Sequence, residues 1–400
     1  MALLTYIILI SFFNVAFSED CLINNVPEEM AFEKQLRKDL KCNYRQFDPP
    51  VANSSTYTVD VRFVMKYFTF NSNEEVFSMH TWMFISWKDE RVKWDPAKYY
   101  GIEQTEIFSM SLWTPGFKLF NSADSSDYDK FFYVRCHVRY TGDILCVPKI
   151  THEATCSVKL TNWPYDVQEC SLDFGPWNSK WFSFRMNFTS RAITMIGAEY
   201  GAEWFISDYK QEEDFSSEKQ LKMIFVLERE ASGLAAVVVY PSIILTALSV
   251  TSLFLDVRRN VRLGVACFSL LGHYDFLSEL AQDIPKESAF PPTLLLYYRG
   301  SVVLTVMIIL STFFLTAICK LKSTPQNYII SMNDFVYESF GKYLVFPRWD
   351  CYDSTIDSKQ FSEDWTKFSN VINSVFLFII IVAYISMYFS LMPKPAPVNY

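Results

Sequence analysis

The chain has 400 residues, half of them hydrophobic, and a formal net charge of −8. It contains no extended basic run, which argues against nucleic acid as a partner, because phosphate binding needs clustered lysines and arginines. It also lacks a glycine-rich phosphate loop, an HExxH motif, a GxSxG motif and a CxxC pair. We therefore expect that the protein is not an enzyme and binds no cofactor or metal. Its negative net charge favours a cationic or neutral ligand.

Residues 1–18 are apolar and end in Ala16-Phe17-Ser18, with small residues at both cleavage-determining positions. This stretch is shorter than the roughly 20 residues of a spanning helix, so it predicts a secretory signal peptide rather than an anchor. Two acceptor tripeptides for N-glycans begin at Asn53 and Asn187. We therefore expect residues 19–230 to lie outside the cell.

Six of the nine cysteines precede the first long apolar segment, on the side where disulfides form and persist. Cys156 and Cys170 enclose thirteen residues, and a disulfide between them would restrict the unfolded chain by roughly 3 kcal/mol. Such a bond makes the loop a stiff projecting unit.

The remaining four cysteines predict two further pairs. Cys136 and Cys146 lie symmetrically about Thr141 in an expected hairpin, so they face each other across two antiparallel strands. Cys21 and Cys42 are assigned to each other by elimination alone.

The part before residue 230 predicts one helix followed by strands. Phe32, Leu36 and Leu40 recur at a four-residue spacing, which indicates a short amphipathic helix. From Tyr57 to Met65 apolar and polar residues alternate, which is typical of a strand with one buried face. Repeated short strands and turns continue to about residue 230 and favour an all-β, immunoglobulin-like sandwich.

The second part predicts a four-helix, all-α membrane domain. Spanning helices are expected at residues 234–255, 294–319 and 371–392, and residues 231–319 hold the first three helices. The arginines at positions 258, 259 and 262 place the first loop in the cytoplasm, since short cytoplasmic loops are rich in Lys and Arg. The cytoplasmic loop is then 320–370, and both the amino terminus and residues 393–400 are extracellular.

The segment 261–283 is long enough to span but contains ionisable residues, among them Arg262, His273 and Asp275. Such residues are costly at membrane depth unless they face water or one another, which predicts a helix that lines an aqueous path. The alternative is an amphipathic helix on the membrane surface. The fixed orientation of the flanking spans favours a true crossing.

Several segments together resemble the Cys-loop family of pentameric ligand-gated ion channels, and nicotinic acetylcholine receptor subunits most. They are the thirteen-residue loop with its Trp-Pro-Tyr-Asp core, residues 113–124 and residues 82–87. The borders of the charged segment at 256–264 and 284–285 resemble those of the family's pore helix, and residues 363–365 resemble its pre-membrane helix. The likeness covers nearly the whole chain.

The resemblance implies a ligand site formed as an aromatic cage between subunits, where a quaternary or protonated amine is held by cation-π attraction. Trp177 matches the central tryptophan, Phe120 stands where the family usually has a tyrosine, and Trp82 matches the complementary face. Tyr209 is a candidate for the flexible loop. For each residue the alternative is an ordinary aromatic of the sandwich core.

Two departures from the family pattern concern the ligand site. Residues 208–218 contain Glu212-Glu213-Asp214 where principal nicotinic subunits have two adjacent cysteines, and Gly116 replaces the usual aspartate after Trp-x-Pro. The chain therefore resembles a non-α subunit. Such a subunit could still supply Trp82 to the complementary face of a ligand site between subunits.

The pore helix departs further, because Arg259 stands where cation-selective relatives have a glutamate ring. Counting forward from Asp256 predicts that Arg259, Arg262, Ala266, Ser269, His273 and Phe276 line the pore. Counting backward from Pro285 suggests a two-residue insertion and brings Leu271, Asp275 and Ser278 inward instead. Both registers remain open, and so do cation conduction, anion conduction and no conduction.

Coupling of the sandwich to the membrane helices is expected at Arg229, which matches a family arginine that pairs with acidic residues. Asp166 on the disulfide loop is its expected neighbour, and Pro285 holds the outer loop on which the disulfide loop presses. A desolvated pair would be costly to break singly. The alternative is an exposed surface pair of little consequence.

We thus expect a subunit of a neurotransmitter-gated channel that couples binding of a small amine-like ligand to pore opening. Its partners would be that ligand, permeant inorganic ions, homologous subunits of a homo- or hetero-pentamer and membrane lipid. Its location would be the plasma membrane, for example at a synapse. The alternative is a non-conducting accessory subunit that modulates assembly or ligand binding of a partner receptor.

Overall fold

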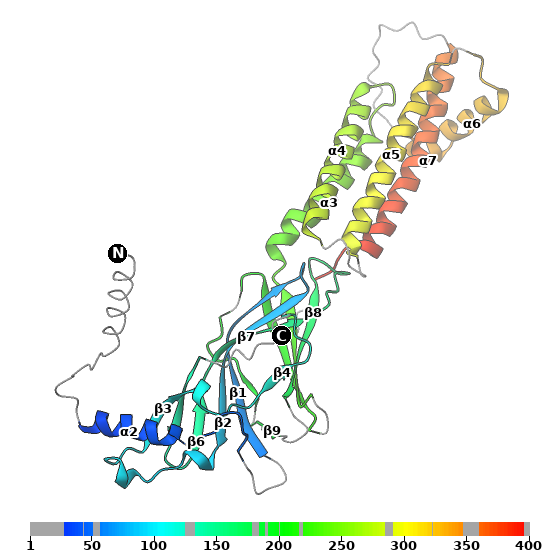
Figure 1. The fold of residues 1–400 in the computed structure, drawn as a ribbon. Helices are drawn as coiled ribbons and strands as arrows, with labels where there is room; N and C mark the ends of the chain where they lie inside the picture. The colour runs from blue at the N-terminus through cyan, green and yellow to red at the C-terminus, as the bar shows by residue number, and fades with distance from the viewer. Residues whose placement is uncertain are drawn as a thin grey trace, which may run out of the picture.

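The computed structural model describes residues 28–42, 44–50, 57–124, 133–177, 184–188, 191–199, 201–215, 219–284, 291–321, 323–346 and 360–395. A β-sandwich occupies one end of the molecule and a bundle of long helices the other, as Figure 1 shows. The expected signal peptide, Cys21, Asn53 and Pro285 lie outside the described residues.

The helix α2, Glu28–Cys42, opens the described chain, and its Leu36 is fully buried. Arg37 on the same helix donates from Nε to the Thr105 hydroxyl at 3.1 Å. The predicted amphipathic helix is therefore present and packs on the end of the sandwich. Cys42 is exposed at its last position, and its expected partner is not among the described residues.

Two sheets form the sandwich. The larger sheet contains β1 (Tyr57–Asn71), β2 (Val76–Lys88), β3 (Gln104–Phe108), β5 (Arg135–Arg139), β6 (Asp143–Cys146), β7 (Lys149–Thr155), β9 (Phe184–Asn187) and β10 (Ile193–Thr194). The smaller sheet has the order β11 (Trp204–Glu213), β12 (Leu221–Arg229), β8 (Val167–Pro176) and β4 (Phe117–Leu119). Short 3-10 helices lie at Glu90–Val92, Pro96–Lys98 and Ser109–Ser111.

The core lies between the two sheets. Val59, Val61, Phe63 and Met65 alternate with outward residues along β1, and each is at most 2% exposed. Phe63 meets Phe174 of the other sheet at a ring-centroid distance of 5.0 Å. The period-two pattern thus correctly predicted a strand with one face in the core of a sandwich.

Both disulfides expected within the described residues are present. Cys136 and Cys146 join β5 to β6 with their Cα atoms 4.3 Å apart, and the hairpin turns at Gly142, whose φ of 88° favours glycine. Cys156 and Cys170 join the start of the projecting loop to β8 with Cα atoms 5.2 Å apart.

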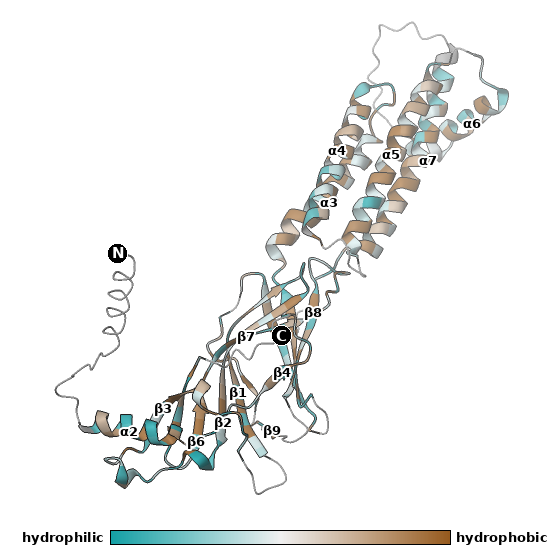
Figure 2. Cartoon of the chain, viewed as in Figure 1, coloured by the Kyte–Doolittle hydropathy of each residue, from teal (hydrophilic) through white to brown (hydrophobic). Residues whose placement is uncertain are grey.

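The bundle consists of α3 (Ser232–Ser252), α4 (Asn260–Asp283), α5 (Thr293–Cys319) and α7 (Gln360–Leu391), and the shorter α6 (Asn327–Glu338) and a 3-10 turn at Phe340–Tyr343 follow α5. Within the described residues, three helices are long and apolar enough to cross a membrane: α3, α5 and residues 363–391 of α7. Figure 2 shows hydrophobic colouring along α5 and α7 and more polar turns on α4. Helix α4 packs against α3 and α5, which explains how the most polar of the four is accommodated.

The carboxyl-terminal helix differs from the expectation in one respect. The expected pre-membrane helix and last span form one continuous helix that begins at Gln360 rather than near Val371. The side chain of Asn333 on α6 donates to the carbonyl of Asp364 at 3.0 Å, and the Trp365 indole donates to the carbonyl of Ser323 at 2.8 Å. These contacts hold the first turns of α7 against α6 and against the segment between α5 and α6.

Candidate functional site

Two of the expected cage residues lie together at the end of β8. Trp177 follows β8 directly and is 60% exposed, while Phe120 follows β4, the strand that pairs with β8. The Trp177 amide donates to the Gly116 carbonyl at 2.8 Å, and a Cβ at Gly116 would lie 3.1 Å from the Trp177 Cβ. Glycine at position 116 therefore permits this close approach of the tryptophan.

The two rings share a cationic neighbour. The Nζ of Lys118 lies 4.6 Å from the ring centroid of Trp177 and 5.5 Å from that of Phe120. The Nζ of Lys219 lies 5.9 Å from the Phe120 centroid and 2.9 Å from a carboxylate oxygen of Asp173. We call Lys118, Phe120, Trp177 and Lys219 the Trp177 surface.

Trp82 lies on a different surface, the outer face of the larger sheet, and is 37% exposed. Its neighbours in register are Val64 of β1 on one side and Lys149 of β7 on the other. The Nζ of Lys66 is 4.7 Å and that of Lys149 is 5.3 Å from the Trp82 centroid. We call Lys66, Trp82 and Lys149 the Trp82 surface.

Tyr209 does not join Phe120 and Trp177. It pairs with Phe225, which pairs with Cys170, seven residues before Trp177 on β8. At about 3.3 Å per residue this places Tyr209 roughly 23 Å along the strands from Trp177. The expectation that Tyr209 belongs to the same cage is not met within this chain.

Tyr209 instead borders a surface cavity of about 540 Å³ whose lining includes Arg191, Met195 and Gln211. Its hydroxyl donates to the Gln211 side-chain oxygen at 3.1 Å, and its ring packs against Phe225 at 5.2 Å. Burial raises the pKa of the Tyr209 phenol well above its ordinary value, Glu213 raises it further, and Arg191 opposes both. The phenol is therefore a neutral hydrogen-bonding group.

Arg229 and Asp166, expected as neighbours, form a buried ion pair at the membrane end of the sandwich. The Arg229 Nε lies 2.8 Å from Asp166 Oδ1, with side-chain exposures of 5% and 0%. Arg229 also pairs with Glu203, and its guanidinium carbon lies 4.1 Å above the Trp204 ring. The guanidinium is thus paired on two sides and covered by an indole, which excludes the alternative of an exposed surface pair.

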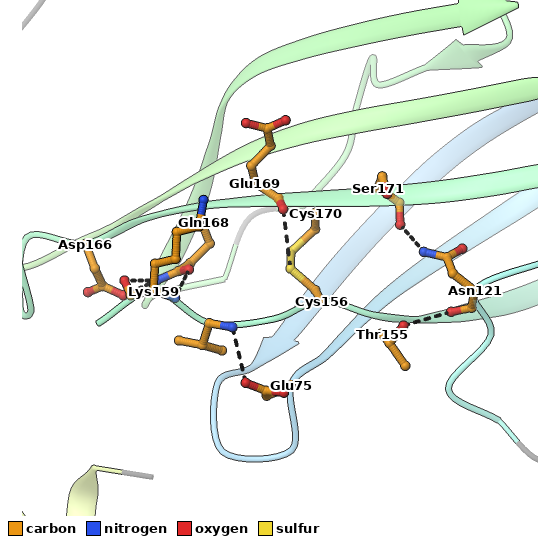
Figure 3. The surroundings of a disulfide bond; sticks show 11 residues. Glu75, Asn121, Thr155, Cys156, Lys159, Asp166, Gln168, Glu169, Cys170 and Ser171 are labelled. Atoms are coloured by element: carbon orange, nitrogen blue, oxygen red, sulfur yellow. Dashed lines mark hydrogen bonds between the residues drawn. A yellow bond between two sulfur atoms is a disulfide. The ribbon is translucent and has the colours of Figure 1, made fainter. Parts of the chain in front are cut away.

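Figure 3 shows the disulfide and the hydrogen bonds that hold the loop carrying Asp166. The side-chain amide of Gln168 links two parts of the loop. Its nitrogen donates to Asp166 Oδ2 at 2.7 Å and to the Lys159 backbone carbonyl at 3.1 Å, and its Oε1 accepts the Lys159 backbone amide at 2.9 Å. Glu75, in the β1–β2 turn, accepts the amides of Cys156 at 2.8 Å and Val158 at 3.3 Å. Hydrogen bonds therefore tie the loop to the start of β8 and to the β1–β2 turn.

The tip of this loop contacts two helix ends of the bundle. The Thr161 carbonyl accepts both the amide and the hydroxyl of Thr293, the first residue of α5, at 3.0 Å each. The Asn162 side chain makes two hydrogen bonds to the backbone of Lys394, just after α7, at 2.8 and 3.1 Å. Sequence reasoning missed these residues, because nothing in their local pattern distinguishes them from ordinary turn residues.

The polar stripe of α4 faces the bundle. Four residues of the first pore register, Arg262, Ala266, Ser269 and His273, are each 0% exposed. Side chains that a subunit buries within itself do not face a channel axis. The structure therefore argues against that register, and the reason is that neighbouring helices offer hydroxyl and carbonyl groups to these polar side chains.

The hydrogen bonds of this stripe connect all four long helices. The two ring nitrogens of His273 lie 2.7 Å from the Ser269 carbonyl and 2.6 Å from the Ser301 hydroxyl, which is 3.1 Å from the Tyr384 hydroxyl. Farther along α4, the Ser269 hydroxyl lies 2.7 Å from that of Ser249. A buried hydroxyl network thus replaces the aqueous lining that the sequence suggested for these positions.

The opposite face of α4 is exposed and includes the residues of the second register. Phe268 and Leu271 are each 67% exposed, and Asp275 and Ser278 are exposed on the following turns. Arg259 is exposed at the N-cap of α4, whereas its neighbour Arg258 pairs with Asp256 at 3.0 Å. The second register is compatible with the fold, and Arg259 is accessible in either one.

Comparisons with known proteins agree with this architecture. Residues 33–231 match the family described as neurotransmitter-gated ion-channel ligand binding domain. The acetylcholine receptor subunit beta-type lev-1 of Caenorhabditis elegans is 27% identical over 298 residues, which are 74% of this chain and 58% of that protein. The neuronal acetylcholine receptor subunit beta-2 of Carassius auratus is 25% identical over 278 residues, 68% of this chain and 59% of that protein.

A third relative extends farther along the chain. The neuronal acetylcholine receptor subunit beta-3 of Rattus norvegicus is 24% identical over 339 residues, 83% of this chain and 72% of that protein. The matches to the first two relatives span less than two thirds of their lengths. Taken with the disulfide loop, the sandwich and the apolar helices, these matches show that the chain belongs to the Cys-loop family and is a nicotinic acetylcholine receptor-like subunit.

Proposed function

We propose that this chain is a subunit of a pentameric channel of the plasma membrane in which an extracellular amine-like ligand, similar to acetylcholine, opens a transmembrane pore. The observation that carries the proposal is the continuous set of contacts from the disulfide loop to the bundle. Asp166 binds Arg229 at the end of β12, three residues before α3 begins, Thr161 binds Thr293 at the start of α5, and Asn162 binds Lys394 after α7. One loop therefore contacts the ends of α5 and α7 and the last residue of β12, the strand that leads into α3.

Gating would use this loop as a lever. A ligand that binds between subunits and favours one arrangement of the sandwich would displace the loop, and the displacement would reach the helices through these three contacts. Because Asp166 and Arg229 are both almost fully buried, their pair resists separation and transmits motion as a unit.

The pore would be lined by the exposed face of α4, at Gly264, Phe268, Leu271, Asp275 and Ser278, which recur every three or four residues. Five copies of Arg259 at the cytoplasmic end of that face would form a positive ring that opposes cation flow. The relative number of these subunits in a pentamer would then set which ions pass.

The test is to express the chain alone and together with nicotinic acetylcholine receptor subunits and to record ligand-evoked currents, with wild type and Arg259→Glu. If the subunit conducts, Arg259→Glu shifts the reversal potential toward that of a more cation-selective channel. The exposed Arg258, which already pairs with Asp256, supplies a neighbouring control as Arg258→Gln. An unchanged reversal potential in Arg259→Glu contradicts a place for Arg259 at the pore.

The second candidate is an accessory subunit that shapes assembly or ligand binding of a partner receptor without conducting. The departure that favours it is the exposed arginine at the α4 N-cap, which does not suit a cation pore. Currents that appear only with partner subunits, and whose ion preference ignores Arg259, would support this role.

A further inference from the structure

We propose that lysines of this chain itself occupy the cation positions of both aromatic surfaces, so that its own rings do not receive an amine ligand. Lys118 is the principal specificity-determining residue, because its ammonium group lies within 6 Å of two ring centroids at once. The inference deepens the proposed function and rests on it, since it concerns the ligand site of the same receptor.

The geometry at Trp177 is that of a cation already bound. An ammonium group within about 6 Å of a ring centroid is attracted by the electrons of the ring face, which is the attraction that an amine ligand would use. Lys118 makes this contact with Trp177 at 4.6 Å and with Phe120 at 5.5 Å. Its side chain is partly buried, and it is anchored on β4 next to Phe117 and Leu119, which pair with β8.

A competing amine would face two obstacles on this surface. It would have to displace the Lys118 ammonium from the rings, and it would then lie within a few ångströms of that like charge. Lys219 adds a second ammonium 5.9 Å from the Phe120 centroid, although Asp173 neutralises it in part at 2.9 Å. Lys118 has no carboxylate within 4 Å among the described residues to offset its charge in the same way.

The Trp82 surface repeats the arrangement with different residues. Strands β1 and β7 flank β2 on its two sides, and each supplies one ammonium group to the indole of Trp82, Lys66 at 4.7 Å and Lys149 at 5.3 Å. On both sheets, therefore, a lysine of the chain itself occupies the position that the ammonium group of a free ligand would take. In an assembled receptor, an amine ligand would be held by the aromatic residues of partner subunits.

The experiment measures binding of tetramethylammonium to the full-length protein in a maltoside detergent by saturation-transfer NMR of its methyl protons. Wild type is expected to bind weakly or not at all, and Lys118→Met, which keeps the length of the side chain without the charge, is expected to bind about fivefold more tightly or better. Lys118→Arg retains a cation over the rings and should resemble wild type. Lys98→Met, at an exposed lysine of the 3-10 helix Pro96–Lys98, controls for the change in net charge.

A further variant identifies the ring. Adding Trp177→Leu to Lys118→Met should abolish the gain, whereas an amine bound elsewhere would be unaffected. Tight binding by wild type, or no gain in Lys118→Met that retains the wild-type near-ultraviolet circular dichroism, would overturn the proposal. Because the assay detects binding and not current, a protein that does not conduct still gives an answer, which separates this proposal from the proposed function.

Discussion

Two buried arginines, one at the membrane end of the sandwich and one inside the bundle, are stabilised in different ways. The Arg229 side chain is 5% exposed and pairs with Asp166 and Glu203. Arg262 is 0% exposed, but its partners are neutral: the Thr312 hydroxyl at 3.0 Å and the Leu255 carbonyl at 3.4 Å. Its Nη2 atom is buried without a hydrogen-bond partner in the described part of the chain.

The difference shows for which of the two arginines the positive charge itself stabilises the fold. At the junction two carboxylates compensate the guanidinium, and removal of Arg229 leaves Asp166 buried without a counter-charge among the described residues. In the bundle no carboxylate lies within 4 Å of Arg262 among the described residues, so the fold gains little from its charge. The first arginine is therefore a structural connection, and the second is tolerated because packing and two neutral acceptors hold it.

The largest expected effect follows from breaking the junction pair. Arg229→Gln should lower the free energy of unfolding by about 3–5 kcal/mol, because Asp166 remains as a buried carboxylate to which, among the described residues, only the Gln168 side chain still donates. The measurement is thermal unfolding of the purified protein followed by intrinsic fluorescence, with Asp166→Asn and the double variant alongside.

The control is an exposed pair on the same sandwich. Arg135 and Glu106 lie 3.3 Å apart with side-chain exposures of 66% and 40%, so Arg135→Gln should cost at most about 1 kcal/mol. The double variant at the junction should lose less than the sum of its two single losses. Equal losses at the two arginines would mean that the junction pair is not the connection described above.

A smaller effect is expected in the bundle. Thr312→Val removes the hydroxyl that accepts from Arg262 Nε and should destabilise the protein by about 1–3 kcal/mol, since a buried charged donor is left without a partner. Arg262→Met should cost much less, and in the Met background Thr312→Val should become nearly neutral. The midpoint of thermal inactivation in detergent reports all three variants, and additive losses would contradict the coupling.

Much of the sandwich could be predicted because its signals are local. Alternation along residues 57–65 determines which face of β1 is buried, and thirteen residues between Cys156 and Cys170 are enough to predict their disulfide. The Asp166–Arg229 pair was expected from the family pattern, and the apolar lengths of the three most hydrophobic helices predicted spans.

The orientation of α4 could not be predicted, because the helix presents polar residues on both faces. Whether Ser269 and His273 face water or the bundle depends on hydroxyls that α3 and α5 bring close, such as Ser249 and Ser301, and these lie 20 and 28 residues away in sequence. Lys118 was also missed, although it lies only two residues before Phe120, whose ring its ammonium group approaches. Its contact with Trp177 requires the pairing of β4 with β8.

The smallest expected effect comes from a histidine of the sandwich, which contrasts with the fully buried His273 of the bundle. His80 stacks on Tyr67 at a centroid distance of 3.9 Å, and its Nδ1 lies 2.8 Å from the Thr151 hydroxyl. Burial lowers the pKa of His80 below its ordinary value of 6.5, and Glu153 offsets part of that effect. The unfolded chain therefore binds a proton more readily than the folded sandwich does.

It follows that the contribution of His80 to stability is complete above pH 6.5 and is lost as the pH falls through its lower folded-state pKa. His80→Gln keeps a hydrogen-bonding side chain without titrating, so the variant should lose less stability than wild type between about pH 6.5 and pH 5. Thermal unfolding of both proteins over this interval measures the slope, and the difference between them should be constant above pH 7, which serves as the internal control. If His80→Gln instead loses more stability than wild type as the pH falls, the prediction is wrong. That result would mean that the folded sandwich favours the protonated ring, because the attraction of Glu153 outweighs the effect of burial.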